Sequence, residues 1–536
     1  MLLATTNQSG AGKDPSLGLA LRQSELMTWN PRTLWRIARE VLAHGIRPSS
    51  LNAISAARHP KQLAVIDEFG ELTYRELHAR VLKLASALRD RFDVGPTKGV
   101  AIMCRNHRAF IEALLAGSTL GADVILLNTE FPGPQLAQIL GHHQLGCVVH
   151  DSDFSAAFEQ SGYAGARVVA GSGSLSVEDL ISSGSGRVKA SRKQGKIVVL
   201  TSGTTGVPKG AARTPSFRAL SGPVITLLTK IPLRARNTIL IASPLFHGFG
   251  LAYLILSLLL GATMVLRRRF DPTELLADIA RHRVQALIAV PTLLKRLVDA
   301  AEGAPSGRDY TSLKAVLSSG AHLGGALCGG IMKTFGPCLY NLYGSSETGF
   351  GAIATPADLV EAPGTVGFPP IGTAIRLLDQ AGQPTPAGQV GRVFLHTGLV
   401  FTGYVGGGNK EIVDGFMSTG DLGHMDLKGR LFIDGRADDM IVSGGENVFP
   451  LEVEEVLAGH PSVAEVAIIG VADEQFGQRL KAFVVSRPGQ QITEDGLRGY
   501  LKERIARYKA PRDFVFLSQL PRNATGKVLK RDLAAN

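Results

Sequence analysis

The sequence contains few cysteines, and they follow no pattern of a cysteine-dependent protein. Cys104, Cys147, Cys328 and Cys338 include no C-x-x-C pair and no paired framework. We therefore expect reduced, buried thiols. The first residues, MLLATTNQSGAGKDP, also lack the basic and apolar regions of a secretory signal. A cytoplasmic protein is expected on that basis.

Two common catalytic motifs are also missing. No G-x-S-x-G is present, which argues against a serine hydrolase with HGFG (247–250) as an oxyanion element. The loop TSGTTGVPKG (201–210) is not a Walker A loop, because Pro208 and Gly210 stand where a glycine and a hydroxyl are required. Its hydroxyls, small residues and Lys209 still suit phosphate oxygens. We interpret it as a phosphate cradle of another kind, with an ordinary turn as the alternative.

One uncharged run has the length of a membrane span. Residues 248–266 carry no charge and are followed by Arg267, Arg268 and Arg269. Gly261 divides this run into a helix-like AYLILSLLL and a strand-like ATMVL. The division predicts a buried helix and a buried parallel strand instead of a span.

The charge balance favours anionic partners. The net charge is +11, and basic residues cluster at 187–196, at 267–269 and in the C-terminal hundred residues. This suits nucleotides, a polyphosphorylated cofactor or peripheral contact with the anionic inner face of a membrane. No aromatic-and-basic signature points to nucleic acid. A solvated surface is the alternative for each cluster.

The 536-residue chain is long enough for several subdomains, and its pattern is α/β. From about Lys61 it alternates apolar strands with amphipathic helices such as YRELHARVLKLASALRD (74–90). The strands are GVAIMC, DVILLN, ALIAV, AVLSSG and EVAIIGV. They predict largely parallel sheets. Residues 171–196 form a polar connection of low hydrophobicity.

A domain boundary is expected within 430–457, where a turn at Asp434-Gly435 separates two strands. A simpler α+β pattern follows, with a helix over 494–505 and Thr493 as its N-cap. The chain is therefore predicted to be α/β, with a large N-terminal domain of several α/β subdomains (1–434), a hinge (435–438) and a small, mobile α+β C-terminal domain (439–536).

Four further stretches accompany the loop at 201–210. They are YNLYGSSETG (340–349), STGD (418–421), GRADDMIVSGGENVFPLEVE (435–454) and PRNATGKVLKRDL (521–533). In this order and at these separations they resemble the adenylate-forming superfamily of acyl-CoA synthetases, peptide-synthetase adenylation domains and firefly-type luciferases. The resemblance runs from about Gln62 to the C-terminus. It implies that ATP converts a carboxylate into an acyl-adenylate, a mixed anhydride with AMP as leaving group.

The resemblance also implies the site residues. Thr201, Ser202, Gly203, Thr204, Thr205, Gly206 and Lys209 would surround the ATP phosphates, and Gly320, Ala321, Asn341, Tyr343, Gly344, Ser345 and Ser346 the adenine. Ser346 replaces the threonine of many members but keeps the hydroxyl. Asp421 would accept both ribose hydroxyls, with Arg436 near the same ribose or a phosphate. Glu347, with Thr201, would hold Mg²⁺, and Lys527 would bridge the carboxylate and the α-phosphate.

The small domain is expected to rotate after adenylation, as it does in the family. The resemblance places the hinge at Asp438 and lets Gly445 line a thiol tunnel, where a glycine gives the pantetheine arm of coenzyme A room. His247 would act as a gate between the acyl pocket and the tunnel, with a core histidine as the alternative.

The acid is expected to have an uncharged tail. PLFHGFG (244–250) lacks the aspartate with which amino-acid-activating members hold an ammonium group, and LAYLILSLLL follows. Together with LLNTEFPGPQLAQIL (126–140), the sequence looks most like a bacterial fatty-acid–CoA ligase for medium- or long-chain acids. The alternatives are a fatty acyl-AMP ligase that loads a carrier protein, an aryl-acid–CoA ligase, a luciferase-like oxidase and a non-catalytic nucleotide sensor.

Overall fold

The computed structural model describes residues 16–534 except 27–34, 36, 38, 42–44, 172–174, 202–208, 212–216, 304–308, 346–347, 399–403, 406–409, 444–445, 474–475 and 524–525. The side chains of 201, 209–211, 217–220, 404–405 and 447 are also outside this description. The described chain forms four sheets, named here by their order from first to fourth.

The first and second sheets confirm the predicted parallel α/β pattern, whereas the predicted strand EVAIIGV (465–471) pairs antiparallel with its neighbour in the fourth sheet. The first sheet has the order β14 (Gly349–Ala354), β13 (Leu339–Ser345), β12 (Ala315–Ser318), β11 (Ala286–Ile288), β9 (Thr238–Ile241), β10 (Thr263–Val265), β1 (Leu63–Asp67) and β2 (Gly70–Thr73). The second has the order β17 (Tyr404–Val405), β8 (Lys209–Ala211), β7 (Ile197–Thr201), β4 (Val124–Leu126), β3 (Gly99–Met103), β5 (Leu145–Asp151) and β6 (Ala166–Ala170). In both sheets the inner strands pair in parallel, and antiparallel partners lie at the edges.

Helices cover these two sheets. They are α1 (Leu17–Gln23), α3 (Pro48–Arg58), α4 (Tyr74–Phe92), α5 (Arg108–Leu120), α6 (Gly133–Gly141), α7 (Ser155–Gln160), α8 (Val177–Ser183), α9 (Phe217–Lys230), α10 (Gly248–Leu260), α11 (Pro272–Arg281), α12 (Pro291–Glu302), α13 (Gly325–Phe335) and α14 (Pro356–Glu361). The helix predicted over 74–90 is α4, which begins with a Thr73–Glu76 capping box and ends at Phe92, with Asp93 as its C-cap. Helix α8 lies within the polar connection predicted over 171–196.

The uncharged run folds as predicted. Helix α10 ends at Leu260 and is capped by Gly261, whose φ of +60° suits glycine, and β10 follows as a buried parallel strand. The Tyr74 hydroxyl, buried on α4, donates to the Ala262 carbonyl at 2.7 Å and fixes this turn. Among the described helices, none is both long and apolar enough to span a membrane.

The third sheet corrects the sequence analysis in two respects. It is antiparallel, with the order β15 (Thr373–Leu378), β16 (Gly391–Thr397), β19 (Phe416–Met425) and β18 (Ile412–Val413), and with β20 (Leu431–Arg436) also on β19. The predicted turn at Asp434-Gly435 is wrong, because β20 runs through both residues and pairs Gly435 with Leu422. Tertiary pairing thus overrides a local turn signal. The chain turns later, in a 3-10 segment, η2 (Ala437–Asp439).

The fourth sheet belongs to the C-terminal part of the chain. It contains β22 (Glu446–Val448), β21 (Ile441–Ser443), β24 (Gly477–Ser486) and β23 (Val463–Asp473), with β25 (Asp513–Phe516) on β24, and helices α15 (Pro450–Ala458), α16 (Glu494–Lys502) and α17 (Lys530–Ala534) accompany it. Thr493 caps α16 as predicted, but the helix ends at Lys502, short of Ile505. Both Arg504 and Ile505 donate to the Leu501 carbonyl, which tightens the chain into a turn.

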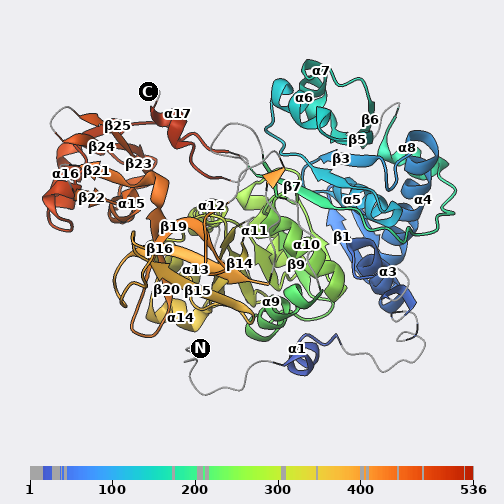
Figure 1. Ribbon diagram of the computed structural model, residues 1–536, viewed down its shortest axis with the longest axis horizontal. Helices are drawn as coiled ribbons and strands as arrows, with labels where there is room; N and C mark the ends of the chain where they lie inside the picture. Colours follow the sequence, from blue (N-terminus) through green and yellow to red (C-terminus); the bar gives the residue numbers. More distant parts are fainter. Residues whose placement is uncertain are drawn as a thin grey trace.

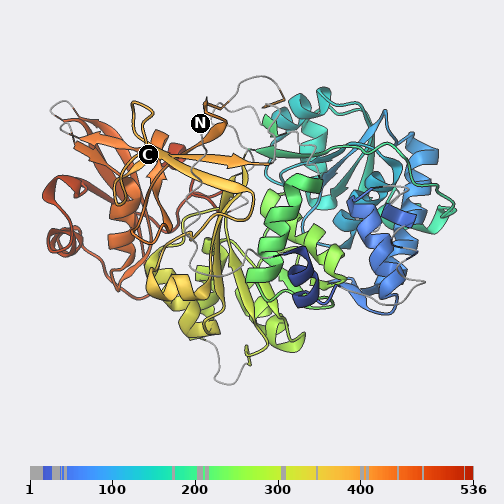
Figure 2. The same cartoon turned by 60° about the horizontal axis from the view of Figure 1, so that its bottom comes forward.

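The four sheets are arranged along the long axis of the molecule. Figure 1 shows the second sheet at one end, the first sheet in the middle, and the fourth sheet with α15 and α16 at the other end. Figure 2 shows the same separation from another side. The large N-terminal part and the smaller C-terminal part agree with the predicted fold class. The hinge at 435–438 stays a prediction.

Candidate active site

Predicted site residues gather at the carboxyl ends of parallel strands in the first sheet. Gly320 and Ala321 follow β12, Tyr343 lies near the end of β13, and His247 comes after β9. The ends of adjacent parallel strands form one edge, which is where α/β sheets bind ligands. The sheet order places residues far apart in sequence beside one another at this edge.

Asp421 is the centre of a hydrogen-bonded cluster at this edge. The Tyr343 hydroxyl donates to Asp421 Oδ2 at 2.6 Å, and Arg436 Nη1 donates to Oδ1 at 3.1 Å. Antiparallel pairing of β19 with β20 sets Asp421 directly opposite Arg436. Three residues predicted for the nucleotide from separate motifs therefore meet. A carboxylate with one hydrogen bond on each oxygen keeps acceptor capacity for a ribose diol.

Burial and charge set the protonation of this cluster. Burial, reinforced by the charge of Asp421, raises the pKa of the Tyr343 hydroxyl well above its ordinary value, so the phenol stays a donor. Burial would lower the pKa of Arg436, but the charge of Asp421 and the hydrogen bonds with Asp438 and Asp421 outweigh it and raise the pKa. The guanidinium therefore remains a fixed cation beside the predicted ribose position.

Lys527 is near enough to Asp438, which pairs with Arg436 of this cluster, for its charge to act on that carboxylate. Arg436 Nε donates to Asp438 Oδ1 at 3.1 Å. Burial would raise the pKa of Asp438, but the hydrogen bond and charge of Arg436, with a smaller contribution from Lys527, lower it. Lys527 is exposed, and its backbone N–H donates to Asn523 Oδ1 at 2.9 Å. The preceding residue, Gly526, lies so close to Thr292 that a Cβ atom added to Gly526 would be 2.2 Å from Thr292 Oγ1.

The predicted adenine wall contains both exposed backbone and buried side chains. Gly320, at φ +89°, and Ala321 are exposed. Asn341 is buried and donates through Nδ2 to the Thr365 carbonyl at 3.0 Å, so it shapes the wall by fixing a loop. At Gly344 a Cβ atom would lie 2.1 Å from the Gly349 carbonyl oxygen, so only glycine fits. The Ser345 hydroxyl accepts from Thr348 N–H at 3.1 Å.

The predicted phosphate loop connects two strands. Thr201 ends β7, Lys209 begins β8, and the two residues are partners in the antiparallel register. The structure thus brings the two ends of the loop together. Ser202, Gly203, Thr204, Thr205 and Gly206 lie outside the described residues, as do Ser346, Glu347 and Gly445. The phosphate, Mg²⁺ and thiol-tunnel assignments that depend on them stay predictions.

His247 lies directly before α10 and makes no side-chain cap to that helix. Burial lowers the pKa of its imidazole, so the ring is neutral at neutral pH. Its ring centroid is 6.2 Å from that of Phe246. A neutral, half-buried ring suits either the predicted gate or a packed histidine.

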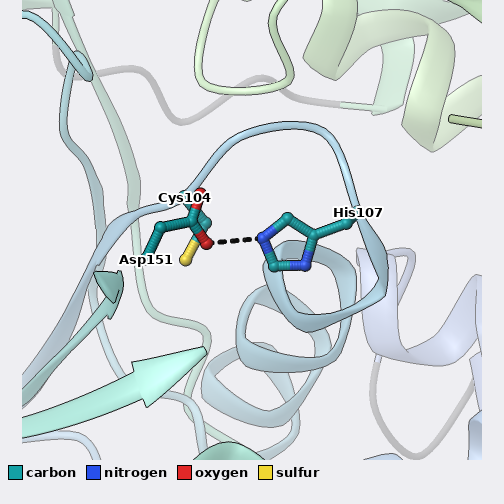
Figure 3. Close-up of side chains that lie close together, drawn as sticks. All are labelled: Cys104, His107 and Asp151. Atoms are coloured by element: carbon teal, nitrogen blue, oxygen red, sulfur yellow. Dashed lines mark hydrogen bonds and ion pairs between the residues drawn. The ribbon is translucent and has the colours of Figure 1, made fainter. Parts of the chain in front are cut away.

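A buried cluster outside this site is structural. Cys104, His107 and Asp151 place a thiol, an imidazole and a carboxylate within 4.8 Å of one another (Figure 3). His107 Nδ1 accepts from Ala109 N–H at the start of α5, so the proton on Nε2 is donated to Asp151 Oδ1 at 2.7 Å. The imidazole has no free lone pair for a metal ion. The cluster instead joins β5 to the start of α5.

Sequence reasoning missed two residues at this edge. Thr292 is the second residue of α12 and lies against Gly526, beside Lys527, and His322 follows the Gly320-Ala321 backbone. His322 Nε2 lies 2.5 Å from Glu455 Oε1 on α15. Neither residue belongs to a motif, and the contacts join segments far apart in the chain. Only the position of His322 directly after Gly320-Ala321 could have drawn attention to it.

Comparison with known proteins agrees with this geometry. The AMP-binding enzyme family matches residues 53–405, and the AMP-binding enzyme C-terminal domain matches 452–527. Feruloyl-CoA synthase of an Amycolatopsis species is 32% identical over 493 residues, covering 89% of this chain and 96% of that protein. The fatty acid–[acyl-carrier-protein] ligase ScoC of Streptomyces coeruleorubidus is 30% identical, covering 89% and 94%.

A solved structure shares the fold. The o-succinylbenzoate CoA synthetase of Bacillus subtilis, in complex with its acyl-adenylate intermediate, superimposes with a TM-score of 0.77 at 29% identity, covering 90% of this chain and 97% of the other. The fold and site thus define an adenylate-forming enzyme. The chain belongs to the AMP-binding enzyme family and is an AMP-forming acid–thiol ligase.

Proposed function

We propose that this ligase activates a medium- or long-chain fatty acid and transfers it to coenzyme A. In the first step the carboxylate attacks the α-phosphorus of ATP, and pyrophosphate leaves. In the second step the thiol attacks the acyl carbon, the bond to AMP breaks, and the thiol proton is released. The products are acyl-CoA, AMP and pyrophosphate.

The observation that carries the choice of acid is the open face of α10. Phe249, Ile255 and Leu259 are half-buried and Ala252 is exposed, although the helix carries no charge. At 100° per residue these four positions fall on one side of the helix. From position 249 to position 259 this face is about 15 Å long. An apolar strip of this length offers burial along a chain and few polar contacts for a substituted ring.

The proposed chemistry assigns roles to the site residues. Asp421, Arg436 and Tyr343 would hold the adenosine, and Lys527 would neutralise the carboxylate and the α-phosphate as they approach. The loop from Thr201 to Lys209 would hold the leaving pyrophosphate, and Glu347 with Thr201 would hold Mg²⁺. His247 and Gly445 would guide the thiol after the small domain has rotated about Asp438.

A cavity beside this edge supports coenzyme A as the acceptor. It measures about 370 Å³ and has apolar walls that include Phe246 and Val290. Its polar side is formed by Asn106, Thr129, Glu130 and four arginines, Arg105, Arg267, Arg268 and Arg269, and we call the whole the arginine cavity. Val290 lies 3.6 Å from a Cβ position on Gly320, so the cavity adjoins the predicted adenine wall. Coenzyme A matches this division, because the methylene and dimethyl groups of its pantetheine arm can pack on apolar walls and its phosphates can pair with arginines.

Arg268 has donor capacity to spare in this cavity. Its Nη2 is 3.7 Å from Asp151 Oδ2 and 3.8 Å from Asp153 Oδ1, both longer than hydrogen bonds. Its Nε is buried with no hydrogen-bond partner. Arg267, by contrast, is held by Asp278 through two bonds of 2.7 Å. Arg268 is therefore the side chain that we assign to a phosphate of the acceptor.

An aryl acid is a second candidate, because the feruloyl-CoA and o-succinylbenzoate enzymes act on ring-bearing acids. ScoC supports a fatty acid but has a carrier protein as its acceptor. A cytoplasmic location and contact with an anionic membrane stay predictions.

The test is kcat/KM for straight-chain acids beside benzoate, ferulate and several amino acids at fixed ATP and coenzyme A. Each added methylene should contribute about 0.8 kcal/mol until the pocket is full. Four methylenes then give roughly two orders of magnitude in kcat/KM if the gain is expressed in the transition state. A flat chain-length profile, or a preference for a ring or an amino acid, would refute the fatty-acid proposal and leave the adenylation chemistry intact.

A further inference from the structure

His322 and Glu455 join the two parts of the molecule across a long sequence separation. His322 precedes α13 in the large part, and Glu455 lies on α15 in the small part. Their Nε2 and Oε1 atoms are 2.5 Å apart. Figure 1 shows α13 and α15 in the region where the two parts meet, and they are in contact.

Few ion pairs accompany this one between residues 16–434 and 439–534. In the described part of those ranges, the other is Arg487 Nη1 to Asp299 Oδ1, at 4.0 Å, the limit for such a pair. The rest of the contact includes Gly526 against Thr292. His322–Glu455 is therefore the short, directional polar contact in this interface.

This contact exists in the arrangement that brings Lys527 to the site. Gly526 touches Thr292 on α12, and the adjacent Lys527 contributes to the electrostatics of Asp438 beside Arg436. Glu455 and Lys527 belong to the same small domain, whereas His322 and Thr292 belong to the large one. A rotation of the small domain that removed Lys527 from the site would also move Glu455 relative to His322.

We infer that His322 and Glu455 are positioning residues for the adenylation step. Their contact favours the domain arrangement that presents Lys527, and it opens before the thiol step. The inference rests on the proposed two-step function, in which one small domain serves both steps. Because the two side chains are only partly buried, at 24% and 43% exposure, the contact biases the arrangement without locking it.

The first test separates the two half-reactions, using the acid with the highest kcat/KM in the panel. In His322→Ala and Glu455→Gln, pyrophosphate release without coenzyme A should fall about two- to fivefold, the size expected for a partly exposed pair. Thioester formation from a supplied acyl-adenylate should be unchanged or faster. Lys527→Ala is the reference and should lose adenylation while thioester formation remains.

Matched controls keep this test specific. Glu452 lies on the same helix but binds Lys509 inside the small domain, so Glu452→Gln should leave the ratio of the two rates unchanged. The double variant His322→Ala/Glu455→Gln should be no slower in adenylation than either single variant. His322→Glu should be slower still, and adding Glu455→Lys should restore the rate. Equal loss in both half-reactions, additive single effects or no rescue would overturn the inference.

A second readout does not depend on catalysis. Lys333 on α13 and Lys502 on α16 are exposed, and the four native cysteines are buried, so Lys333→Cys and Lys502→Cys can carry a pair of spin labels. His322→Ala should reduce the population at the interlabel distance of the present arrangement by about two- to fivefold relative to other distances. An unchanged distance distribution would refute the positioning role even if no acid in the panel proved to be a substrate.

Discussion

Asp421 binds two different partners with one side chain. Tyr343 donates to one carboxylate oxygen and Arg436 to the other. Because Tyr343 stays protonated and Arg436 stays charged, these bonds fix the direction of the carboxylate. A fixed acceptor loses little entropy when a ribose diol binds. Residue-level recognition of the family motif found all three side chains, and the structure added that they touch.

Arg268 provides a residue-scale prediction for the arginine cavity. Arg268→Gln removes the cation with the unpartnered Nε and leaves a shorter, neutral polar side chain. We expect KM for coenzyme A to rise about tenfold, the loss of one charge-assisted hydrogen bond of about 1.4 kcal/mol. Pyrophosphate release without coenzyme A should not change.

The control for this prediction is Arg281→Gln, on α11. Arg281 is 60% exposed, pairs with Asp278 at 3.6 Å and does not line the cavity. It should leave KM for coenzyme A unaltered. If Arg268→Gln instead weakened ATP-dependent adenylation, or left KM for coenzyme A as it is, the cavity would not hold the acceptor.

At the scale of elements, helix α10 is uncharged throughout but has a buried side and a partly open side. Its buried side, including Leu254 and Leu258, belongs to the main core, while Phe249, Ala252 and Ile255 remain partly open. Gly261 predicted that the uncharged run is divided into a helix and a strand and is not a membrane span, and it caps the helix as predicted. The division into a buried and an open side depends on the elements packed around the helix.

Ala252→Phe tests the open face of α10 as the acyl site. Ala252 is exposed on this face, so a larger ring there would fill the volume available to a substrate without entering the core. We expect the preferred acid to become shorter, with kcat/KM for the longest acids falling at least tenfold and that for short acids little changed. The measurement is the same chain-length series as for the wild type.

Leu427→Phe is the control for this substitution, since Leu427 is 96% exposed and far in sequence from α10. It should leave the chain-length profile unaltered. An unaltered profile in Ala252→Phe as well would remove α10 from the acyl site.

For the whole molecule, a half-buried histidine, His59, sets a lower pH limit on stability. Burial, with the charges of Arg58 and Arg236, lowers the pKa of His59 from its ordinary 6.5 to about 4. Between pH 6.5 and pH 4, His59 is protonated in the unfolded chain but not in the folded chain. The free energy of unfolding is therefore unaffected by this histidine above pH 6.5, and it decreases as the pH falls towards 4.

The expected loss between pH 7 and pH 5 is about 1 kcal/mol, less than the full shift implies because solvent reaches the half-buried ring. His59→Gln cannot titrate and should show a smaller drop in unfolding midpoint over the same interval. His142→Gln, at an exposed position, should behave like the wild type. Equal drops in the wild type and His59→Gln would show that His59 does not limit stability.

The sequence by itself determined the features that depend on short stretches of chain. Periodicity and caps located α4, α10 and the start of α16, because helix contacts join residues three or four apart. The order of the motifs indicated the superfamily, because each phosphate, ribose or carboxylate contact needs a particular residue type at a particular loop.

Only the tertiary structure decided how these stretches meet. In the structure, β20 continues through Asp434-Gly435, and Asp421 pairs with Arg436. The residues of the arginine cavity lie together, and His322 contacts Glu455. Each of these depends on strand pairing or domain contact between residues distant in sequence. Local propensity contributes a fraction of a kcal/mol per residue and cannot select among such partners, whereas burial of whole sheet faces and interfaces can.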